Sequence, residues 1–299
     1  MPSVLAIDVG GSKIVAAVVD AAGVVSGRVQ RPLAVSQDQA GVMAAVKSLA
    51  HEAAGVGVDA IGVTIPGLAD PEAGLWVYSP FSGIRDVPVK RLLEDEFRLP
   101  VGIENDVNAC ARAEMRFGLC ADGQSFIWLT VSNGIGGCVV VDGRVMTGAD
   151  NCAGEIGHVI VVEDGVLCGC GHHGCAEVYG AGPAIARRWR EAGGAPGLDA
   201  KAIAELARRG DATARRVFGD TGYFIGKALA PAVSLLNPHK VVLGGGVSLS
   251  FDLFQEQLWA ALGALAFPAA LEHLTVEPTA LGYDAGLLGA AAIVLPPTA

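Results

Sequence analysis

Four side chains that bind soft metal ions lie close together in the sequence. They are His158, Cys168, Cys170 and Cys175, and glycines separate the cysteines. Thiolates together with an imidazole suit a tetrahedral zinc ion, and glycines allow a short segment to turn sharply around it. Because four protein ligands leave no position for water, such an ion would be structural. The alternative is a loop of free thiols with solvated histidines.

Two glutamates flank these ligands. Glu155 lies three residues before His158, and Glu177 lies two residues after Cys175. A zinc ion would fix both carboxylates, which we expect to face a polar ligand, although they could instead form a buried structural pair. Cys152, His172 and His173 could substitute for one of the four ligands.

A further carboxylate could act as a general base. An apolar strand is expected over 101–104 and a helix over 107–117, with Asn105 and Asp106 between them. The positive end of a helix dipole keeps a carboxylate at the helix start ionised. An ionised Asp can accept the proton of a hydroxyl group that attacks a phosphoryl group. The alternative is that Asn105 or Asp106 only caps the helix.

Glycine turns between strands form a repeated pattern. Gly10, Gly11, Ser12 and Lys13 separate strands expected over 4–8 and 14–19, and a third strand follows over 24–29. About 120 residues later, Asn133, Gly134 and Gly136 separate strands expected over 126–131 and 138–141. Successive backbone N–H groups in such a turn suit phosphate oxygens. The pattern is neither a Walker loop nor a dinucleotide fingerprint, because a strand follows where those motifs need a helix.

Two more strands end in turns that suit a ligand. The strand over 60–65 leads into Gly67, at the carboxyl end where α/β folds place ligands. The strand over 240–243 leads into Gly244, Gly245 and Gly246, where a backbone could lie against a flat ring. The alternative for the second turn is an ordinary strand-to-helix connection.

The remaining elements complete an α/β chain. Helical spacing appears over 39–54, 182–194, 201–209, 212–218 and 220–236, and an alanine-rich helix begins near 286 and runs to about 294. Asn237 and Pro238 should end the helix before them. With 299 residues, 52% hydrophobic and 6% aromatic, the composition suits two domains of tightly packed α/β layers.

Charge and cysteine usage restrict the partners. A net charge of −10 argues against nucleic acid or an anionic membrane as the main partner. No apolar run approaches the roughly 18 residues of a membrane span, and the first residues lack a charged leader. Seven cysteines, three of them in the metal-like cluster, indicate a reducing cytoplasm and no disulfide framework. Cys110, Cys120 and Cys138 are expected to be buried.

The motifs together resemble the ROK family of repressors, open reading frames and sugar kinases. The resemblance rests on Gly-Glu-x-Gly-His, on Cys-x-Cys-Gly-x-x-Gly-Cys-x-Glu and on Glu104-Asn-Asp-Val-Asn, and it extends from Asp8 to Ala291. It implies the duplicated, ribonuclease H-like fold of actin, Hsp70 and sugar kinases, with a cleft between two α/β domains. The expected smaller domain comprises residues 1–108 and 282–299, and the larger one 109–281. Ser12 replaces the Thr of the Asp-x-Gly-Gly-Thr loop and keeps the hydroxyl group.

The resemblance also implies a reaction, in which a phosphoryl group is transferred from ATP to the 6-hydroxyl of a hexose. Asp106 would be the base, and Asp8 would reach Mg²⁺ through water. The expected sugar ligands are Gly67, Asn105, Glu155, His158 and Glu177. The expected nucleotide contacts are Gly10, Gly11, Ser12, Lys13, Asn133, Gly134 and Gly136 at the phosphates, and Gly244, Gly245 and Gly246 at the adenosine. His158 would serve both zinc and sugar.

The sequence leaves open the sugar, the phosphate donor and the class of protein. Glucose-binding relatives commonly carry Asn and Trp in one loop, whereas this chain has a different sequence there, at residues 79–85. The identity of the sugar is therefore open. It is glucose or a related hexose, an amino-deoxyhexose such as kanosamine, or an N-acetylhexosamine. Asn133 replaces a Thr, which leaves polyphosphate or another nucleotide open as donor. Relatives are commonly homodimers. The alternatives from other classes are a sugar-sensing repressor, whose DNA-binding domain precedes the first glycine turn, and a non-catalytic sugar-binding protein.

Overall fold

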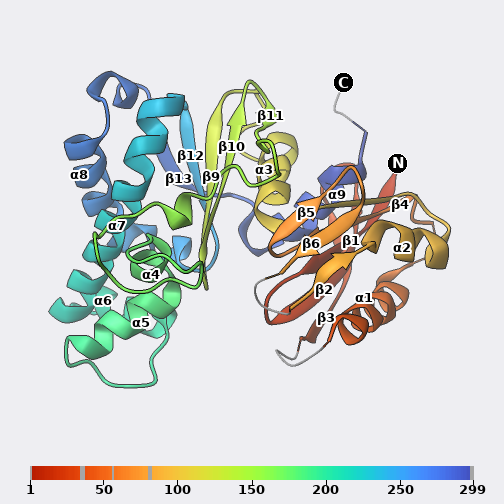
Figure 1. Cartoon of the computed structure of the whole chain (residues 1–299), viewed down its shortest axis with the longest axis horizontal. Helices are drawn as coiled ribbons and strands as arrows, with labels where there is room; N and C mark the ends of the chain where they lie inside the picture. Colours follow the sequence, from red (N-terminus) through yellow and green to blue (C-terminus); the bar gives the residue numbers. More distant parts are fainter. Residues whose placement is uncertain (1, 34–37, 56, 80–82, 297–299) are drawn as a thin grey trace. The chain divides into compact units, whose positions relative to one another are not determined.

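The computed structural model describes residues 2–33, 38–55, 57–79 and 83–296, which form two compact units (Figure 1). Unit 1 comprises residues 1–123, 147–153 and 280–299, and unit 2 comprises residues 124–146 and 154–279.

The centre of unit 1 is a five-stranded sheet in the order β3-β2-β1-β4-β8. Its strands are β1 (Ser3–Val9), β2 (Lys13–Asp20), β3 (Val25–Pro32), β4 (Ala60–Ile65) and β8 (Val101–Asn105). β1, β2 and β3 are antiparallel, whereas β1, β4 and β8 are parallel. The parallel register aligns Asp8 with Thr64 and Thr64 with Glu104. Polar side chains from three strands therefore meet at one edge of the sheet.

Helices cover both faces of this sheet, because alternate residues of each buried strand point to opposite sides. One face packs Leu5, Ile7 and Val9 against α1 (Gln39–Ala53) and α2 (Val89–Phe97). The other face packs Val4 and Ala6 against α9 (Ala285–Val294), which lies on α3 (Asp106–Phe117) (Figure 1). The small sheet of β5 (Leu68–Asp70), β6 (Leu75–Tyr78) and β7 (Arg85–Val87) completes the unit.

Glycines allow α9 to lie close to its neighbours. A Cβ atom at Gly62 would overlap the Ala290 carbonyl, and one at Gly289 would overlap the Ala109 backbone. This packing holds α3 in unit 1, whereas the expected boundary at residue 108 would have assigned most of α3 to the other domain.

Unit 2 repeats the strand order of unit 1. Its sheet has the order β11-β10-β9-β12-β13, with β9 (Phe126–Val131), β10 (Ile135–Val141), β11 (Arg144–Val145), β12 (Lys240–Gly244) and β13 (Thr275–Pro278). Three strands are antiparallel and the last two are added in parallel, as in unit 1. The predicted duplication of the strand, glycine turn and strand unit is therefore confirmed.

Helices and short 3₁₀ turns make up the rest of unit 2. The α-helices are α4 (Glu177–Gly180), α5 (Gly182–Glu191), α6 (Ala200–Arg208), α7 (Ala212–Leu236) and α8 (Gln255–Leu265). The 3₁₀ turns are η1 (Ile156–His158), η2 (Ser248–Leu253) and η3 (Pro268–Leu271), and unit 1 has η4 (Gly282–Asp284).

The prediction of separate helices over 212–218 and 220–236 was wrong, because both belong to α7. Gly219 lies inside the helix without breaking it, at a cost of about 1 kcal/mol relative to Ala. Close packing on α8 compensates, since Gly222 and Gly226 lie directly against the backbone of Phe254 and Leu258. α7 ends at Leu236, as expected ahead of Pro238, and its C-cap Asn237 has a left-handed backbone with φ 44°. Within the described residues, no helix is long and apolar enough to cross a membrane.

Candidate active site

Asn105 is the N-cap of α3 and fixes the start of the helix. Its Oδ1 accepts hydrogen bonds from the backbone N–H groups of Val107 and Asn108, at 2.9 and 3.1 Å. Its Nδ2 donates to the Gly67 carbonyl at 2.8 Å and to Asp106 Oδ1 at 3.0 Å. These four contacts use the full hydrogen-bonding capacity of a side-chain amide. The capping alternative therefore holds for Asn105, which orients both Gly67 and Asp106.

Asp106 is the first residue of α3 and is half-buried. Besides the Asn105 amide, its Oδ1 accepts the Val107 N–H at 3.0 Å. Burial, and secondly the negative charge of Asp8, raise the pKa of Asp106 to about 7. This value contradicts the expectation that the helix dipole keeps the group fully ionised, because desolvation outweighs the favourable backbone contacts. A carboxylate with a pKa near neutrality suits a general base.

Asp8 lies near the end of β1 and is held from two sides. The hydroxyl of Thr64, which is fully buried, donates to Asp8 Oδ1 at 2.7 Å. Gly286, in the first turn of α9, lies so close that a Cβ atom there would overlap the Asp8 carboxylate. Burial raises the pKa of Asp8, whereas the Thr64 hydrogen bond and the charge of Lys13 lower it. The adjacent strands thus place two carboxylates in one neighbourhood of unit 1.

An ion pair between the buried Glu104 and the partly exposed Arg112 connects β8 to α3. Glu104 is buried, and its Oε2 accepts hydrogen bonds from Nε and Nη2 of Arg112 at 3.2 and 3.1 Å. Its Oε1 accepts the Asn105 N–H at 3.0 Å and an Asn108 side-chain N–H at 3.4 Å. Sequence reasoning missed Arg112. The available signal was its spacing of one helical turn from Asn108, on the face that returns to Glu104.

The first glycine turn connects β1 with β2. The Gly10 N–H donates to the Lys13 carbonyl at 2.9 Å, so this amide closes the turn instead of facing outward. The side chains of Ser12 and Lys13 are exposed, as is Gly11. Gly67, near the neighbouring strand end, has φ 86°, which explains why glycine occupies that position.

The four predicted metal ligands come together in unit 2. One ligand atom from each of His158, Cys168, Cys170 and Cys175 lies within 4.8 Å of the others. Tetrahedral coordination with Zn–S bonds of about 2.3 Å separates the sulfur atoms by roughly 3.8 Å. The Cys170 and Cys175 sulfurs are 3.5 Å apart, and Cys168 Sγ is 3.7 Å from His158 Nδ1. The donor set and its spacing therefore fit zinc.

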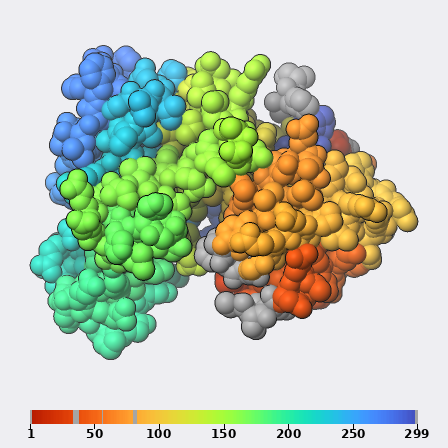
Figure 2. Space-filling model, in the orientation of Figure 1, coloured from red at the N-terminus to blue at the C-terminus, as the bar shows by residue number. Residues whose placement is uncertain are grey.

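Two tight turns build this cluster, within a segment of unit 2 whose atoms are green in Figure 2. The Cys168 N–H donates to the His172 carbonyl at 2.8 Å, and the chain bridges Leu167 to His173 and Ile160 to Cys175. Gly171 and Gly174 have φ of 94° and 84°, and a Cβ atom at Gly174 would overlap the Val162 carbonyl. The predicted use of glycine is thus confirmed at these two positions.

The substitute ligands lie outside the cluster. His173 Nδ1 contacts the Gly165 carbonyl at 2.8 Å, and Cys152 Sγ contacts the Asp150 carbonyl at 3.2 Å within unit 1. His172 Nδ1 lies 3.7 Å from Cys170 Sγ. Hydrogen bonds from the His172 backbone and ring lower the pKa of Cys170 to about 6, which favours the thiolate form that binds metal.

His158 directs its two ring nitrogens to different neighbours. Nδ1 faces Cys168, whereas Nε2 lies 3.8 Å from Glu155 Oε2. The Glu155 side chain is 62% exposed, so this carboxylate is open to a ligand. Glu177, the first residue of α4, accepts the Ile135 N–H at Oε2 with a distance of 3.1 Å. Its Oε1 is 3.8 Å from Cys168 Sγ.

The glycines of unit 2 have different reasons to be glycine. A Cβ atom at Gly134 would meet Glu177, and one at Gly244 would meet the ring of Trp128. Gly245 has φ 84° and lies against the Val131 backbone. At Gly246 a Cβ atom would meet only open space, so this glycine alone of the three offers an open face to a flat ring. Asn133 is exposed beside Gly134.

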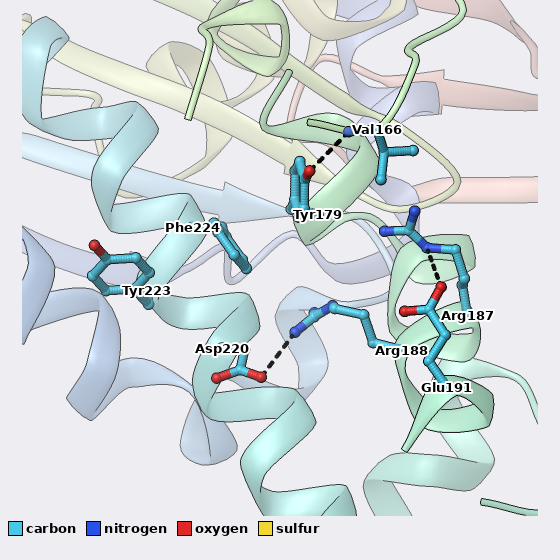
Figure 3. Close-up of a pocket in the computed structure, with 8 residues that line it drawn as sticks. All are labelled: Val166, Tyr179, Arg187, Arg188, Glu191, Asp220, Tyr223 and Phe224. Atoms are coloured by element: carbon cyan, nitrogen blue, oxygen red, sulfur yellow. Dashed lines mark hydrogen bonds and ion pairs between the residues drawn. The ribbon is translucent and has the colours of Figure 1, made fainter. Parts of the chain in front are cut away.

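Unit 2 also contains a hollow of about 440 Å³ between α5 and α7 (Figure 3). Arg188 lies across this hollow and donates a hydrogen bond to the carbonyl of Val217 at 3.0 Å, and it also lies 3.6 Å from Asp220. Burial lowers the pKa of Arg188 to about 10. Arg187 likewise lies 3.7 Å from Glu191. The Arg187–Glu191 pair lies within α5, whereas Arg188 joins α5 to Val217 and Asp220 of α7, so we interpret Arg188 as a structural crosslink between the two helices. Its described lining residues include none of the predicted sugar or nucleotide contacts.

Residues 4–296 match the sequence model of the ROK family. Among curated relatives, a glucokinase of Streptomyces coelicolor is 31% identical over 98% of both chains. An N-acetylmannosamine kinase of Salmonella typhi is 32% identical over 96% of both.

Solved structures of ROK proteins also resemble this chain. A ROK glucokinase from Streptomyces griseus, in complex with glucose and AMPPNP, has a TM-score of 0.86 and 31% identity over 97% of this chain and 98% of that one. A ROK transcriptional regulator homologous to the E. coli MLC protein has a TM-score of 0.88 and 25% identity over 97% of this chain and 77% of that one.

Proposed function

The chain belongs to the ROK family, and from this premise we propose that it is an ATP-dependent sugar kinase that phosphorylates the 6-hydroxyl of glucose or a closely related hexose or aminohexose. The observation that carries the proposal is the environment of Asp106. This carboxylate starts α3, is oriented by Asn105 and has a pKa raised to about 7. Such a group can accept the proton of an attacking hydroxyl at neutral pH.

In the proposed reaction, Asp106 holds the sugar's 6-hydroxyl by a hydrogen bond and accepts its proton as the oxygen attacks the γ-phosphorus of ATP. The bond from that phosphorus to the bridging oxygen breaks, and ADP leaves. Mg²⁺, held through water by Asp8, would supply positive charge to the phosphate oxygens. The N–H groups of Gly11, Gly134 and Gly136 would position the phosphates. Gly10 would contribute through the turn that its own N–H group closes.

The proposed sugar ligands are the residues that the sequence motifs indicate. Glu155 and Glu177 offer acceptors for hydroxyl groups, and with His158 Nδ1 on zinc the Nε2–H group of His158 would donate to a hydroxyl oxygen. Gly67 and Asn105 would contribute from unit 1, and a direct sugar contact by the Asn105 amide would replace one of its four present contacts. Gly246 would face the adenine ring, with Gly244 and Gly245 fixing the turn beneath it.

The precise sugar depends on the loop at 79–85. Ser79 is buried and Arg85 lies over the ring of Tyr78 at 4.7 Å, while residues 80–82 lie outside the described part of the chain. Relatives of comparable identity are named for glucose and for N-acetylmannosamine. We therefore keep glucose first, with N-acetylhexosamines and amino-deoxyhexoses as alternatives.

A coupled assay of ADP release tests the proposal. The purified protein would be given ATP, Mg²⁺ and a panel of hexoses, aminohexoses and N-acetylhexosamines. We expect sugar-dependent ADP release, and Asp106→Asn should lower turnover by roughly 10²–10⁴-fold, which is the usual contribution of a positioned base. The absence of ADP release with every sugar, or normal turnover in this variant, would overturn the proposal.

A sugar-sensing regulator is the second candidate, because one structural relative is a ROK transcriptional regulator. The net charge of −10 argues against DNA as a partner. The same assay separates the two, since a regulator would bind sugar without sugar-dependent turnover. We further propose that the protein works in the cytoplasm, in keeping with its seven cysteines. We also propose that it is a homodimer.

A further inference from the structure

Glu177 lies between the cysteine cluster and the second glycine turn and contacts both. Its Oε2 accepts the backbone N–H of Ile135, 42 positions earlier in the chain, at 3.1 Å. Its Oε1 is 3.8 Å from Cys168 Sγ, on the side of the metal ligands. All of these residues belong to unit 2. One carboxylate thus joins two segments to which different ligands are assigned in the proposed function.

Backbone hydrogen bonds also hold the turn between β9 and β10. The Ser132 N–H donates to the Gly134 carbonyl at 2.9 Å, and the Gly182 N–H donates to the Ser132 carbonyl at 2.8 Å. These bonds fix the beginning of the turn, whereas Glu177 fixes its end at Ile135. Gly134 lies directly against Glu177 Oε2, and a Cβ atom there would overlap that oxygen. The carboxylate therefore fits into the turn and requires the glycine.

A hydrogen bond from a backbone N–H group to a carboxylate is stronger than one to a neutral acceptor. Glycine backbones otherwise have access to many conformations. Removing the carboxylate would therefore release the turn at Gly134 and the N–H group of Ile135 from the orientation seen here, whereas Gly136 stays paired with Thr130 in β10.

We propose that Glu177 is a positioning residue for the nucleotide, and that by serving the sugar and this turn together it couples sugar binding to nucleotide binding. The coupling rests on the proposed function, because it needs the sugar contact of Glu177 and the phosphate contact of the turn. Since coupling between two sites is reciprocal, each ligand should tighten the binding of the other by the same factor.

Glu177→Gln tests the idea with little change in side-chain size. The first measurement is hydrogen exchange of the backbone amides of residues 132–137 in the free protein. We expect exchange at Ile135 to become about tenfold faster, since a tenfold change corresponds to roughly 1.4 kcal/mol. An unchanged zinc content in the variant would show that the cluster is intact.

The second measurement is calorimetric binding of AMPPNP, with and without the best sugar of the kinase panel. In the native protein we expect the sugar to tighten AMPPNP binding at least about fivefold, the lower end of usual couplings. In Glu177→Gln we expect this factor to fall to near one, and AMPPNP to bind several-fold more weakly even without sugar.

Glu155→Gln is the matched control, because Glu155 is also a proposed sugar ligand but its carboxylate faces His158. It should weaken sugar binding while leaving exchange at Ile135 and the coupling factor unchanged. Gly134→Ala should reproduce the nucleotide defect by displacing the carboxylate from the other side.

Unchanged Ile135 exchange and unchanged AMPPNP affinity in Glu177→Gln would overturn the positioning role. A coupling factor that persists in that variant would overturn the coupling. A native protein that shows no sugar-dependent turnover would instead refute the kinase assignment, while exchange at Ile135 would still report on the positioning role.

Discussion

At the scale of single residues, environment decides the chemistry of the candidate site more than residue type does. Asp8 and Asp106 are both aspartates near the ends of parallel strands, and burial raises the pKa of each. The pKa of Asp8 is also lowered by the Thr64 hydrogen bond, whereas that of Asp106 is raised further by the charge of Asp8. The two carboxylates therefore suit different tasks, a ligand near a cation and a proton acceptor.

The raised pKa of Asp106 predicts the pH dependence of activity. Because the base must be deprotonated, kcat/KM should rise about tenfold per pH unit below pH 7 and level off above it. Asp8→Asn removes a negative neighbour, so the residual activity of that variant should level off at a lower pH. Initial rates between pH 5 and pH 9 with the best sugar check both expectations. A flat profile in this range would exclude Asp106 as the titrating base.

Stability should show the opposite dependence. Folding raises the pKa of Asp106 from about 3.9 to about 7, so its contribution to stability is fully present below pH 4 and is lost as pH rises through 7. Asp106→Asn should therefore raise the melting temperature relative to the native protein at pH 8 and have little effect at pH 4. Thermal unfolding at the two pH values measures this difference. An equal shift at both would contradict the raised pKa.

At the scale of elements, the junction of β8 and α3 determines where the base lies. Glu104 is almost fully buried and satisfied by Arg112, which lies two turns into the helix. Removing the arginine would leave a buried carboxylate with fewer partners, which costs several kcal/mol when the group is fully buried.

Arg112→Ala should accordingly destabilise the protein by about 2–4 kcal/mol and lower kcat more than it raises KM for the sugar. The matched control is Arg91→Ala, because Arg91 and Asp95 form an exposed pair on α2 at 3.8 Å. That pair should contribute less than about 1 kcal/mol. Urea unfolding and steady-state kinetics of both variants provide the test. Equal losses of stability would show that the Glu104–Arg112 pair contributes no more than the exposed pair.

The elements also show what a sequence can and cannot predict. Local patterns predicted the strands on either side of both glycine turns and the four metal ligands, because strand periodicity and ligand spacing are local properties. The contacts of Glu104 with Arg112 and of Glu177 with Ile135 depend on side chains from separate elements, which spacing alone does not bring together. Gly219 was misleading, because tertiary packing of α7 on α8 outweighs its low helix propensity.

Two glycines among the cysteine ligands differ in how much space surrounds them. Gly174 has φ 84° and lies against the Val162 carbonyl, whereas a Cβ atom at Gly169 would meet open space. Gly174→Ala should therefore lower the zinc content to less than about half of the native value, while Gly169→Ala should leave it unchanged. Elemental analysis of both purified variants measures the ratio of zinc to protein, and equal contents would contradict the proposed need for glycine.

At the scale of the whole molecule, the same strand order recurs in two units, but each unit stabilises its candidate site differently. Unit 1 holds Asp8 through Thr64 and Gly286 of α9, and it holds Asp106 through Asn105. Unit 2 holds Glu155, His158 and Glu177 through a loop whose regular structure is limited to isolated bridges and short turns. Such a loop needs a crosslink, and zinc would supply it.

Removal of zinc should therefore affect the two units unequally. Structural zinc contributes on the order of 10 kcal/mol to the region that it organises. After chelation we expect faster hydrogen exchange over residues 155–180, and through Glu177 also over 132–137, with little change over β1, β4 and β8. Sugar affinity should fall, and returning zinc should restore both properties. Exchange that accelerates equally in both units would mean that the ion supports the whole fold, and a purified protein without zinc would refute a metal role for the four ligands.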